Sequence, residues 1–386
     1  MKFQIALIVL LISAVFSATN LYVGYSSKSP NYNTIQEAVN KAASINPTSE
    51  SQRVTIHIAV GTYREQVIVN TPYITFMNDD TSKYPTITWY YGIGYKYYSC
   101  NSNGYYDATL AKKKSSKNIA SKWGATVQIW NKAKYFKAYR IIFENSFNRY
   151  ITSEEISDGV TLSGDTSVSS ITFKRTSSSN VQTRTATERA AAITIEGAYA
   201  EFFTCKFYSS QDTIYTGASP EFFKKCVIEG QTDYIFGEAN VVFDFCELRW
   251  KGYSGTTYPG YITAARQGST SSYTGYLFNK CKVYGSSQSL STTAGYLGRP
   301  WASNAKVMFI NTTLQDKNMI LAAGWYSMSG VEPENVAGFK EYGTKLKDGT
   351  TVSLSSRKGH TVSASNASSI NKKNYMNNWT PTYLDA

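Results

Sequence analysis

The feature that most constrains how this chain can fold is a pattern that recurs at an interval of 21 residues. Within Cys205–Gly237, the residues Cys205 and Asp212 are matched by Cys226 and Asp233, each 21 positions further along. A repeat of this length is typical of one coil of a solenoid. If the coils stack through parallel strands, equivalent positions lie about 4.8 Å apart. The repeat therefore predicts that Asp212 and Asp233 are neighbours in space.

Two carboxyl groups at that distance have a chemical consequence. They cannot both ionise cheaply, so one is driven towards its protonated form while the other stays charged. Such a pair supplies a general acid and a nucleophile in one place. Aspartate at a repeat corner can equally serve a turn, so the surrounding residues must decide between catalysis and structure.

The wider repeat has the form Phe-x-x-Cys-x-apolar, with the cysteine replaced in some copies. Its copies begin at Phe136, Phe202, Phe223, Phe243, Phe278 and Phe309. Most intervals exceed one coil, so loops must project between several copies. We predict an all-β fold, a right-handed parallel β-helix whose repeated aromatic and aliphatic residues stack in the core.

The first part of the chain predicts a cap for this solenoid. Tyr32–Ala43 has apolar residues at helical spacing, with Asn33 or Thr34 as the N-cap. A short helix here would cover the unpaired edge of the first coil. Val54–Val60 and Gln66–Val69 alternate as strands.

The chain is expected to form one domain over residues 19–386, with loop insertions near 90–123 and 146–187. The first insertion is rich in Tyr, Gly, Lys and Ser and could add aromatic and cationic surface, or it could be a surface loop without function. The polar segment after Tyr342 is expected to pack back along the solenoid or to cap it.

Met1–Ala18 resembles a secretory signal peptide. Lys2 precedes the apolar run Ile5–Phe16, and the small residues Ser17 and Ala18 suit a cleavage point. The run is shorter than the roughly 20 apolar residues that span a membrane. We therefore expect a secreted, extracellular protein with no membrane partner.

The formal net charge of +12 favours an anionic partner: nucleic acid, an anionic membrane or an acidic polysaccharide. Lys112–Lys114 lies in a Ser-rich stretch typical of a solvated loop, and no nucleic-acid motif is present. His57 and His360 are too few to build a metal cluster, and no GxSxG serine-hydrolase motif or calcium-loop spacing occurs. We predict no metal, no cofactor and no nucleic-acid partner.

The chain has five cysteines, an odd number, so at least one has no intramolecular partner. Cys205, Cys226 and Cys246 are expected on successive coils, at a spacing inside the disulfide range of about 4.4–6.8 Å. Stacked buried thiols would occupy the same positions. Both alternatives remain open at this point.

Four motifs occur together: GTYREQV at Gly61–Val67, QDTIY at Gln211–Tyr215, DYIFG at Asp233–Gly237 and LGRPW at Leu297–Trp301. This set resembles the pectinesterases (pectin methylesterases), whose usual forms are GxYxE, QDTL, DFIFG and LGRPW. The similarity extends from about residue 32 to residue 342. It implies a parallel β-helix that hydrolyses the methyl esters of galacturonate in pectin.

The resemblance also implies roles for individual residues. Asp233 would be the nucleophile, and Asp212 would first donate a proton to methanol and later accept one from water. Arg299 would hold the Asp233 carboxylate through two hydrogen bonds. Gln211 would donate its amide N–H to the developing oxyanion.

One position departs from the family pattern. Arg189 of ERAAAI stands where pectinesterases usually carry a second oxyanion glutamine, in a QAVAL segment. An arginine there could replace the amide as a donor or bind a neighbouring substrate carboxylate. It could instead form an ion pair with Glu188 or Glu201 and leave the oxyanion site incomplete.

The resemblance implies an aromatic cleft for the sugar rings, since flat rings pack on the apolar faces of pyranoses. The candidate substrate-binding residues are Arg189, Tyr215, Phe236, Trp301 and Trp325; for the aromatic members the alternative is core packing. Arg266 in YITAARQG corresponds only loosely to an arginine of the family.

The leading hypothesis is a secreted, monomeric pectinesterase whose partner is pectin. Two carboxyl groups about 5 Å apart also satisfy the geometry of a retaining glycoside hydrolase. A third possibility is a pectin-binding β-helix in which Arg189 has weakened catalysis.

Overall fold

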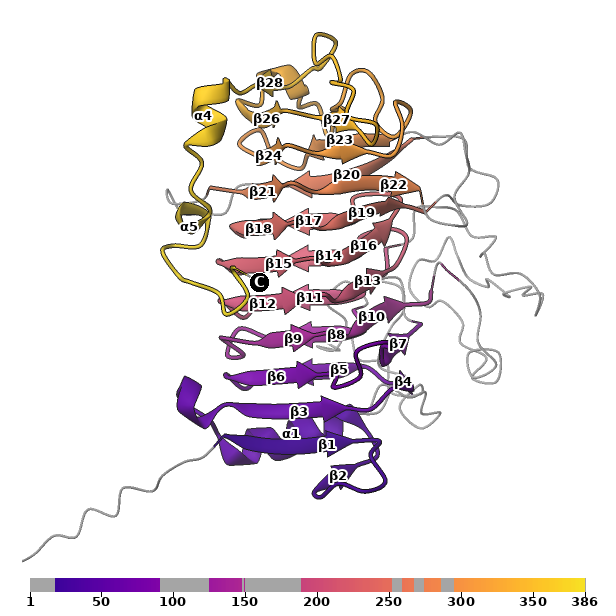
Figure 1. The fold of residues 1–386 in the computed structure, drawn as a ribbon, viewed down its shortest axis with the longest axis vertical. Coiled ribbons are helices and arrows are strands. Elements are labelled where there is room, and N and C mark those ends of the chain that lie inside the picture. Colours follow the sequence, from indigo (N-terminus) through magenta and orange to yellow (C-terminus); the bar gives the residue numbers. More distant parts are fainter. Residues whose placement is uncertain are drawn as a thin grey trace, which may run out of the picture.

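Three parallel sheets wind around a common axis and enclose the core of this molecule (Figure 1). The computed structural model describes residues 18–90, 125–147, 149, 189–251, 259–266, 274–285 and 295–385. Successive strands along the chain pass from one sheet to the next, and each strand pairs with the equivalent strand of the following coil. The predicted all-β, right-handed parallel β-helix is confirmed.

Sheet A has twelve strands. They are β1 (Thr19–Val23), β2 (Asn31–Tyr32), β3 (Val54–Ile58), β6 (Ile74–Met77), β9 (Lys137–Tyr139), β12 (Ala200–Phe203), β15 (Glu221–Lys224), β18 (Val241–Asp244), β21 (Tyr276–Asn279), β24 (Lys306–Ile310), β26 (Gly338–Tyr342) and β28 (His360–Thr361). Sheet B has nine: β4 (Thr62–Arg64), β7 (Thr86–Trp89), β10 (Ile142–Asn145), β13 (Lys206–Tyr208), β16 (Val227–Gly230), β19 (Glu247–Trp250), β22 (Lys282–Gly285), β25 (Thr313–Leu314) and β27 (Lys345–Leu346).

Sheet C has seven strands and carries the candidate site. They are β5 (Val67–Val69), β8 (Val127–Ile129), β11 (Ile193–Ile195), β14 (Ile214–Thr216), β17 (Ile235–Gly237), β20 (Gly260–Ala265) and β23 (Gly295–Pro300). The described helices are α1 (Ile35–Ile45), α4 (Ala364–Ser368) and α5 (Lys372–Tyr375), with short 3₁₀ turns at Glu50–Gln52 and Pro333–Asn335.

The corner between sheets A and B explains the Phe-x-x-Cys pattern. The residue before each cysteine has a left-handed backbone, as at Thr204 (φ 52°) and Lys225 (φ 52°). A single left-handed residue turns the chain sharply between two strands. The phenylalanine before the turn and the cysteine after it, such as Phe202 and Cys205, therefore both point into the core, where they are fully buried.

An aromatic ladder runs through the core along the axis. Ring centroids of successive coils lie 4.3–4.8 Å apart and nearly parallel, in the order Phe202, Phe223, Phe243, Phe278 and Phe309. The ladder confirms that the repeated phenylalanines pack in the core. Stacking of rings adds to the area that each ring buries.

The cysteines at this corner are thiols. Cys205, Cys226, Cys246 and Cys281 are buried and free. The Cys226 Sγ–H group donates to the Phe202 carbonyl oxygen of the preceding coil at 3.5 Å. Of the two alternatives that the sequence left open, the described part of the chain shows stacked thiols.

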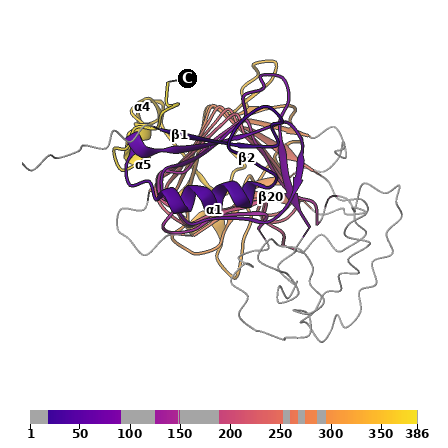
Figure 2. The same ribbon diagram turned by 90° about the horizontal axis from the view of Figure 1, so that it is seen from below.

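Helix α1 covers the open end of the first coil, as predicted (Figure 2). Thr34 is its N-cap: the Glu37 N–H donates to Thr34 Oγ1 at 3.2 Å, and the Thr34 N–H donates to Glu37 Oε2 at 3.1 Å. Glu65 of the GTYREQV motif accepts from the Ile35 N–H at 2.8 Å and the Gln36 N–H at 3.0 Å. The motif glutamate therefore holds the cap onto the solenoid.

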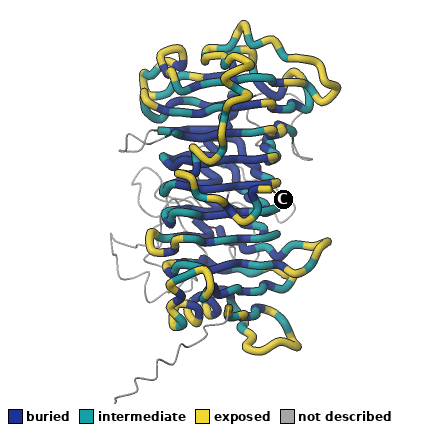
Figure 3. Tube along the Cα trace, turned by 60° about the vertical axis from the view of Figure 1, so that its left-hand side comes forward, coloured by how far each residue is buried: buried dark blue, intermediate teal, exposed yellow. Residues whose placement is uncertain are grey.

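The chain after Tyr342 packs back along the outer face of sheet A (Figures 1 and 3). Near its end, Glu201 accepts from the Thr382 N–H at 3.0 Å and the Tyr383 N–H at 2.6 Å. The Tyr383 ring stacks on Phe203 at 4.4 Å between centroids. These contacts attach the end of the described chain to coils some 180 residues earlier in the sequence.

Several predicted features fall outside the described residues. They are almost all of the predicted signal peptide, Cys100, and most of both predicted insertions. Within the described ranges, no helix is long and apolar enough to cross a membrane.

Two neighbouring phenylalanines test the role of the ladder. Phe243 is fully buried between Phe223 and Phe278, whereas Phe245 is 45% exposed. Phe243→Ala is expected to lower the free energy of unfolding by about 3–5 kcal/mol, because it removes a stacked ring and leaves a cavity. Phe245→Ala should change it by less than about 1 kcal/mol. Chemical denaturation measures both, and equal losses would contradict the assignment.

Candidate active site

The two aspartates occupy equivalent positions on adjacent coils. Asp212 lies two residues before Ile214 of β14, and Asp233 lies two residues before Ile235 of β17. Ile214 pairs with Ile235 in the parallel ladder, and the Asp212 N–H donates to the Thr232 carbonyl at 3.0 Å. The register thus confirms the neighbouring positions that the repeat predicts.

Both aspartates sit at a strained corner. Their φ angles are 60° at Asp212 and 47° at Asp233, in the left-handed region that costs energy for most residues. Aspartate tolerates this conformation better than most side chains. Each residue is only 5% exposed, so both carboxyl groups are largely removed from water.

Arg299 from β23 binds Asp233 through two hydrogen bonds. Its Nε donates to Asp233 Oδ1 at 2.8 Å and its Nη2 donates to Oδ2 at 2.6 Å. The guanidinium carbon lies 4.3 Å from the centre of the Tyr261 ring. Contacts on its edge and on its face fix the orientation of the guanidinium.

These surroundings separate the two carboxyl groups electrostatically. Burial, and then the charge of Asp233, raise the pKa of Asp212 well above the usual range for aspartate. Burial also raises the pKa of Asp233, but the Arg299 hydrogen bonds and charge oppose that rise. These surroundings favour the proton on Asp212 and the negative charge on Asp233.

A pocket of about 330 Å³ opens over this pair. It is lined by Arg189, Gln211, Asp212, Asp233, Phe236, Ala264, Arg299, Trp301 and Met328. Seven of these residues were candidates from the sequence. Met328 lies outside every motif, and Ala264 is an ordinary strand residue that the ladder aligns with Phe236 and Arg299.

The aromatic wall of the pocket has a layered construction. The Phe236 ring lies 6.2 Å from Trp301 and 5.2 Å from Tyr215, which is buried behind it. The guanidinium of Arg266 lies 4.7 Å from the centre of the Trp301 ring and forms an ion pair with Glu238 at 2.8 Å. Phe236 and Trp301 thus line the pocket, whereas Tyr215, a predicted substrate-binding residue, is buried and is not among the lining residues.

Trp325 does not line the pocket, so its assignment to the cleft is wrong. The ring is completely buried and stacks on Phe339 with centroids 4.2 Å apart. The backbone of Trp325 pairs with Gly298 of the LGRPW motif, but the Trp325 side chain belongs to the core. The following residue, Tyr326, is the exposed aromatic at this position, and it packs against Tyr261 and Tyr296.

The chemistry available here is acyl transfer. Asp233, held by the guanidinium of Arg299, lies beside Asp212, and Gln211 and Arg189 are among the residues that line the same pocket. The described residues contain no group of three or more His, Cys, Asp or Glu side chains that could hold a metal ion. A buried nucleophile–acid pair of this kind suits attack on an ester carbonyl.

Comparisons with known proteins agree with this geometry. A family model described as Pectinesterase matches residues 151–383. Pectinesterase A of Emericella nidulans is 37% identical over 141 residues, which are 36% of this chain and 41% of that protein. Pectinesterase 31 of Arabidopsis thaliana is 33% identical over 154 residues, 40% of this chain and 45% of that protein. The matches thus span less than half the length of these curated relatives.

Solved structures show the same fold along nearly the whole chain. The pectin methylesterase from carrot superposes with a TM-score of 0.65 at 21% identity, covering 95% of each chain. The deglycosylated pectin methylesterase from Aspergillus niger gives 0.62 at 25% identity, covering 93% of this chain and 96% of that one.

The raised pKa of Asp212 predicts a pH-dependent stability. In the unfolded chain the pKa of this aspartate is about 3.9. Below that pH, Asp212 is protonated in both the folded and the unfolded state, so its full contribution to stability is present. As the pH rises towards the folded pKa, the unfolded state loses its proton first and stability falls. Asp212→Asn cannot ionise, so its melting temperature should exceed the wild-type value by several degrees at pH 8. The difference should shrink as the pH approaches 4; a difference independent of pH would contradict the assignment.

Proposed function

This chain belongs to the pectinesterase family, since the family model matches more than half of it, and from that premise we propose that it is a pectinesterase. It would hydrolyse the methyl esters of galacturonate units in pectin to give methanol and free carboxylates. The observation that carries the proposal is the pair of hydrogen bonds from Arg299 to Asp233, beside the buried Asp212, whose pKa is raised well above its usual range.

In the first half of the proposed reaction, a carboxylate oxygen of Asp233 attacks the ester carbonyl carbon. A tetrahedral oxyanion forms, and its collapse breaks the bond to the methoxy oxygen. Asp212 gives its proton to that oxygen, so methanol leaves. The product on the protein is an acid anhydride that joins Asp233 to the galacturonate carbonyl.

In the second half, water hydrolyses this acyl-enzyme. Asp212, now a carboxylate, removes one proton from the water as its oxygen adds to the galacturonate carbonyl. Asp233 then leaves as a carboxylate and returns to Arg299, and Asp212 is protonated again. The sum is ester plus water giving carboxylic acid plus methanol, with both aspartates restored.

The negative charge that develops on the carbonyl oxygen needs donors. Gln211 and Arg189 line the pocket beside the aspartates and are the proposed donors. The positive charge of Arg189 opposes the rise in the pKa of Asp212, and this supports a role for its guanidinium close to the reacting groups. In this proposal Arg189 takes over from the usual second glutamine.

Pectin fits the surface of the pocket. Phe236 and Trp301 offer rings for the apolar faces of pyranoses, and the net charge of +12 attracts a polymer that carries free carboxylates. We further propose that the protein is secreted through its first 18 residues and acts outside the cell as a monomer.

The test is methanol release from highly methylated pectin by the purified mature chain, with reducing ends assayed in the same tube. Methanol without new reducing ends is expected. New reducing ends would indicate a glycoside hydrolase, and pectin binding without methanol would indicate a binding protein.

Removal of the nucleophile should abolish turnover without unfolding the chain. Asp233→Ala is expected to lower kcat by at least about 10⁴-fold, because no other group can form the acyl-enzyme. Asp348→Ala, at an exposed turn, is the matched control and should keep activity within about twofold. Circular dichroism checks the fold of both variants. Substantial activity in folded Asp233→Ala would refute the mechanism.

Arg189 can be tested separately. Arg189→Ala should lower kcat by roughly 10²-fold, the usual effect of losing one oxyanion donor. Arg189→Gln should recover part of the loss, because the amide can donate to the same oxygen. An unchanged kcat in Arg189→Ala would exclude a role in the transition state.

A further inference from the structure

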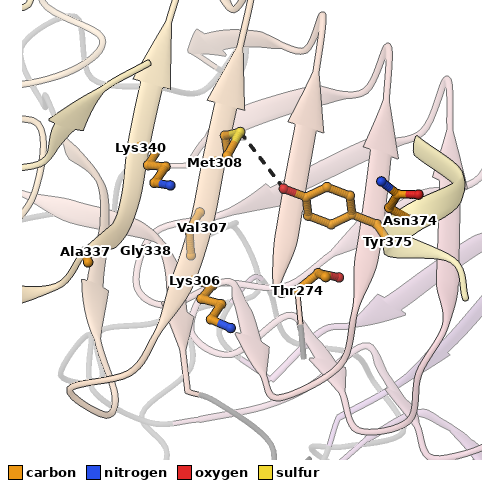
Figure 4. A pocket seen from close by; sticks show the side chains of 9 residues that line it. All are labelled: Thr274, Lys306, Val307, Met308, Ala337, Gly338, Lys340, Asn374 and Tyr375. Carbon is orange, nitrogen blue, oxygen red and sulfur yellow. Dashed lines mark hydrogen bonds between the residues drawn. The ribbon is translucent and has the colours of Figure 1, made fainter. Parts of the chain in front are cut away.

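A second hollow lies on the outer face of sheet A (Figure 4), and it shares no lining residue with the pocket over Asp212 and Asp233. Its volume is about 480 Å³, compared with about 330 Å³ for the catalytic pocket. Strands β24 and β26 form its floor, and helix α5 forms a wall. None of the roles proposed above involves this groove.

The pairing of the two strands creates the hollow. Lys306 of β24 stands opposite Gly338 of β26, and Met308 stands opposite Lys340. Gly338 has no side chain to fill the space, and a Cβ atom there would collide with the Ala305 carbonyl oxygen. Backbone packing therefore excludes a side chain at this position, and Lys306 and Lys340 line the groove on neighbouring strands (Figure 4).

The wall is fixed in place by contacts at both ends of α5. The Tyr375 hydroxyl reaches Met308 Sδ at 4.0 Å, the dashed line in Figure 4. Lys372, at the start of the helix, forms an ion pair with Asp244 at 2.9 Å. These contacts hold α5 against sheet A, so the C-terminal segment forms one side of the groove.

The lining has the chemistry of a site for an acidic sugar. The ammonium groups of Lys306 and Lys340 line the groove together with Met308 and the Tyr375 ring, whereas Val307 between them belongs to the buried core. None of the nine lining residues is acidic. The buried Thr274 hydroxyl has no hydrogen-bond partner among the described residues.

We propose that this groove binds de-esterified galacturonate segments of pectin, separately from the catalytic pocket. The uronate carboxylates would pair with the two lysines, and the apolar faces of the pyranose rings would pack on the floor and on Tyr375. The identity of the polymer rests on the function proposed above. The reaction itself generates carboxylates, so the groove would hold the enzyme on a chain that it has already processed, while the catalytic pocket acts elsewhere on the same polymer.

Retention in gels containing fully de-esterified polygalacturonate tests the proposal. The full chain is compared with Lys306→Gln/Lys340→Gln and with a control, Lys282→Gln/Lys345→Gln. The control removes the same charge from exposed lysines on sheet B. The groove variant should bind roughly three- to tenfold more weakly at low salt, and the control should bind like wild type. Methanol release from a short methylated oligomer should be unchanged in both variants.

Equal retention of the two variants would overturn the proposal, because net charge alone would then explain binding. An equal lysine-dependent loss in a gel containing DNA would also overturn it, because the groove would then accept any polyanion. The retention assay uses a polymer without esters, so its outcome is independent of whether the chain is an esterase. Failure of the proposed function appears only in the methanol assay.

Discussion

The structure depends on the in-register pairing of successive coils through parallel strands. This pairing repeats every side chain at a spacing close to the strand separation, so that like groups stack on like groups. In the core the result is favourable: phenylalanine rings stack face to face and thiols reach the carbonyl oxygens of the coil before. At the corner before sheet C, the same pairing places Asp212 next to Asp233, which is electrostatically unfavourable.

The fold resolves that conflict with one cation and one proton. Asp233 is followed by β17, which pairs with β20, and β20 in turn pairs with β23, the strand that carries Arg299. The two hydrogen bonds from Arg299 favour the charged form of the Asp233 carboxyl group. Within the described part of the chain Asp212 forms no comparable ion pair, and its raised pKa favours the protonated form. In the proposed mechanism the pair supplies a nucleophile and an acid. The cost is a buried, strained corner, which the long ladder of parallel strands on either side can hold in place.

Most of this arrangement could be predicted from the sequence because it follows from the repeat. The 21-residue interval predicted the coil, the ladder and the aspartate pair, and the motifs located Arg299. Trp325 was wrongly assigned to the cleft because a motif does not show whether a side chain points to the core or to the surface. That direction depends on how the segment pairs with its neighbour after the preceding loop. Met328 and the sheet A groove come from loops and from a segment that folds back over distant coils, so no local pattern signals them. Glu65 was recognised within its motif, but its role at the N-terminus of α1 became clear only from the structure.

The central claim is that Asp233 acts as the carboxylate and Asp212 as the acid, and the pH dependence of kcat/KM for methanol release tests it most directly. We expect a bell-shaped profile whose acid limb reports ionisation of Asp233 and whose alkaline limb reports loss of the Asp212 proton. In Arg299→Gln the acid limb should move to higher pH, because the carboxylate of Asp233 has lost its cation. A profile without an alkaline limb, or an acid limb that does not move in that variant, would contradict the division of roles.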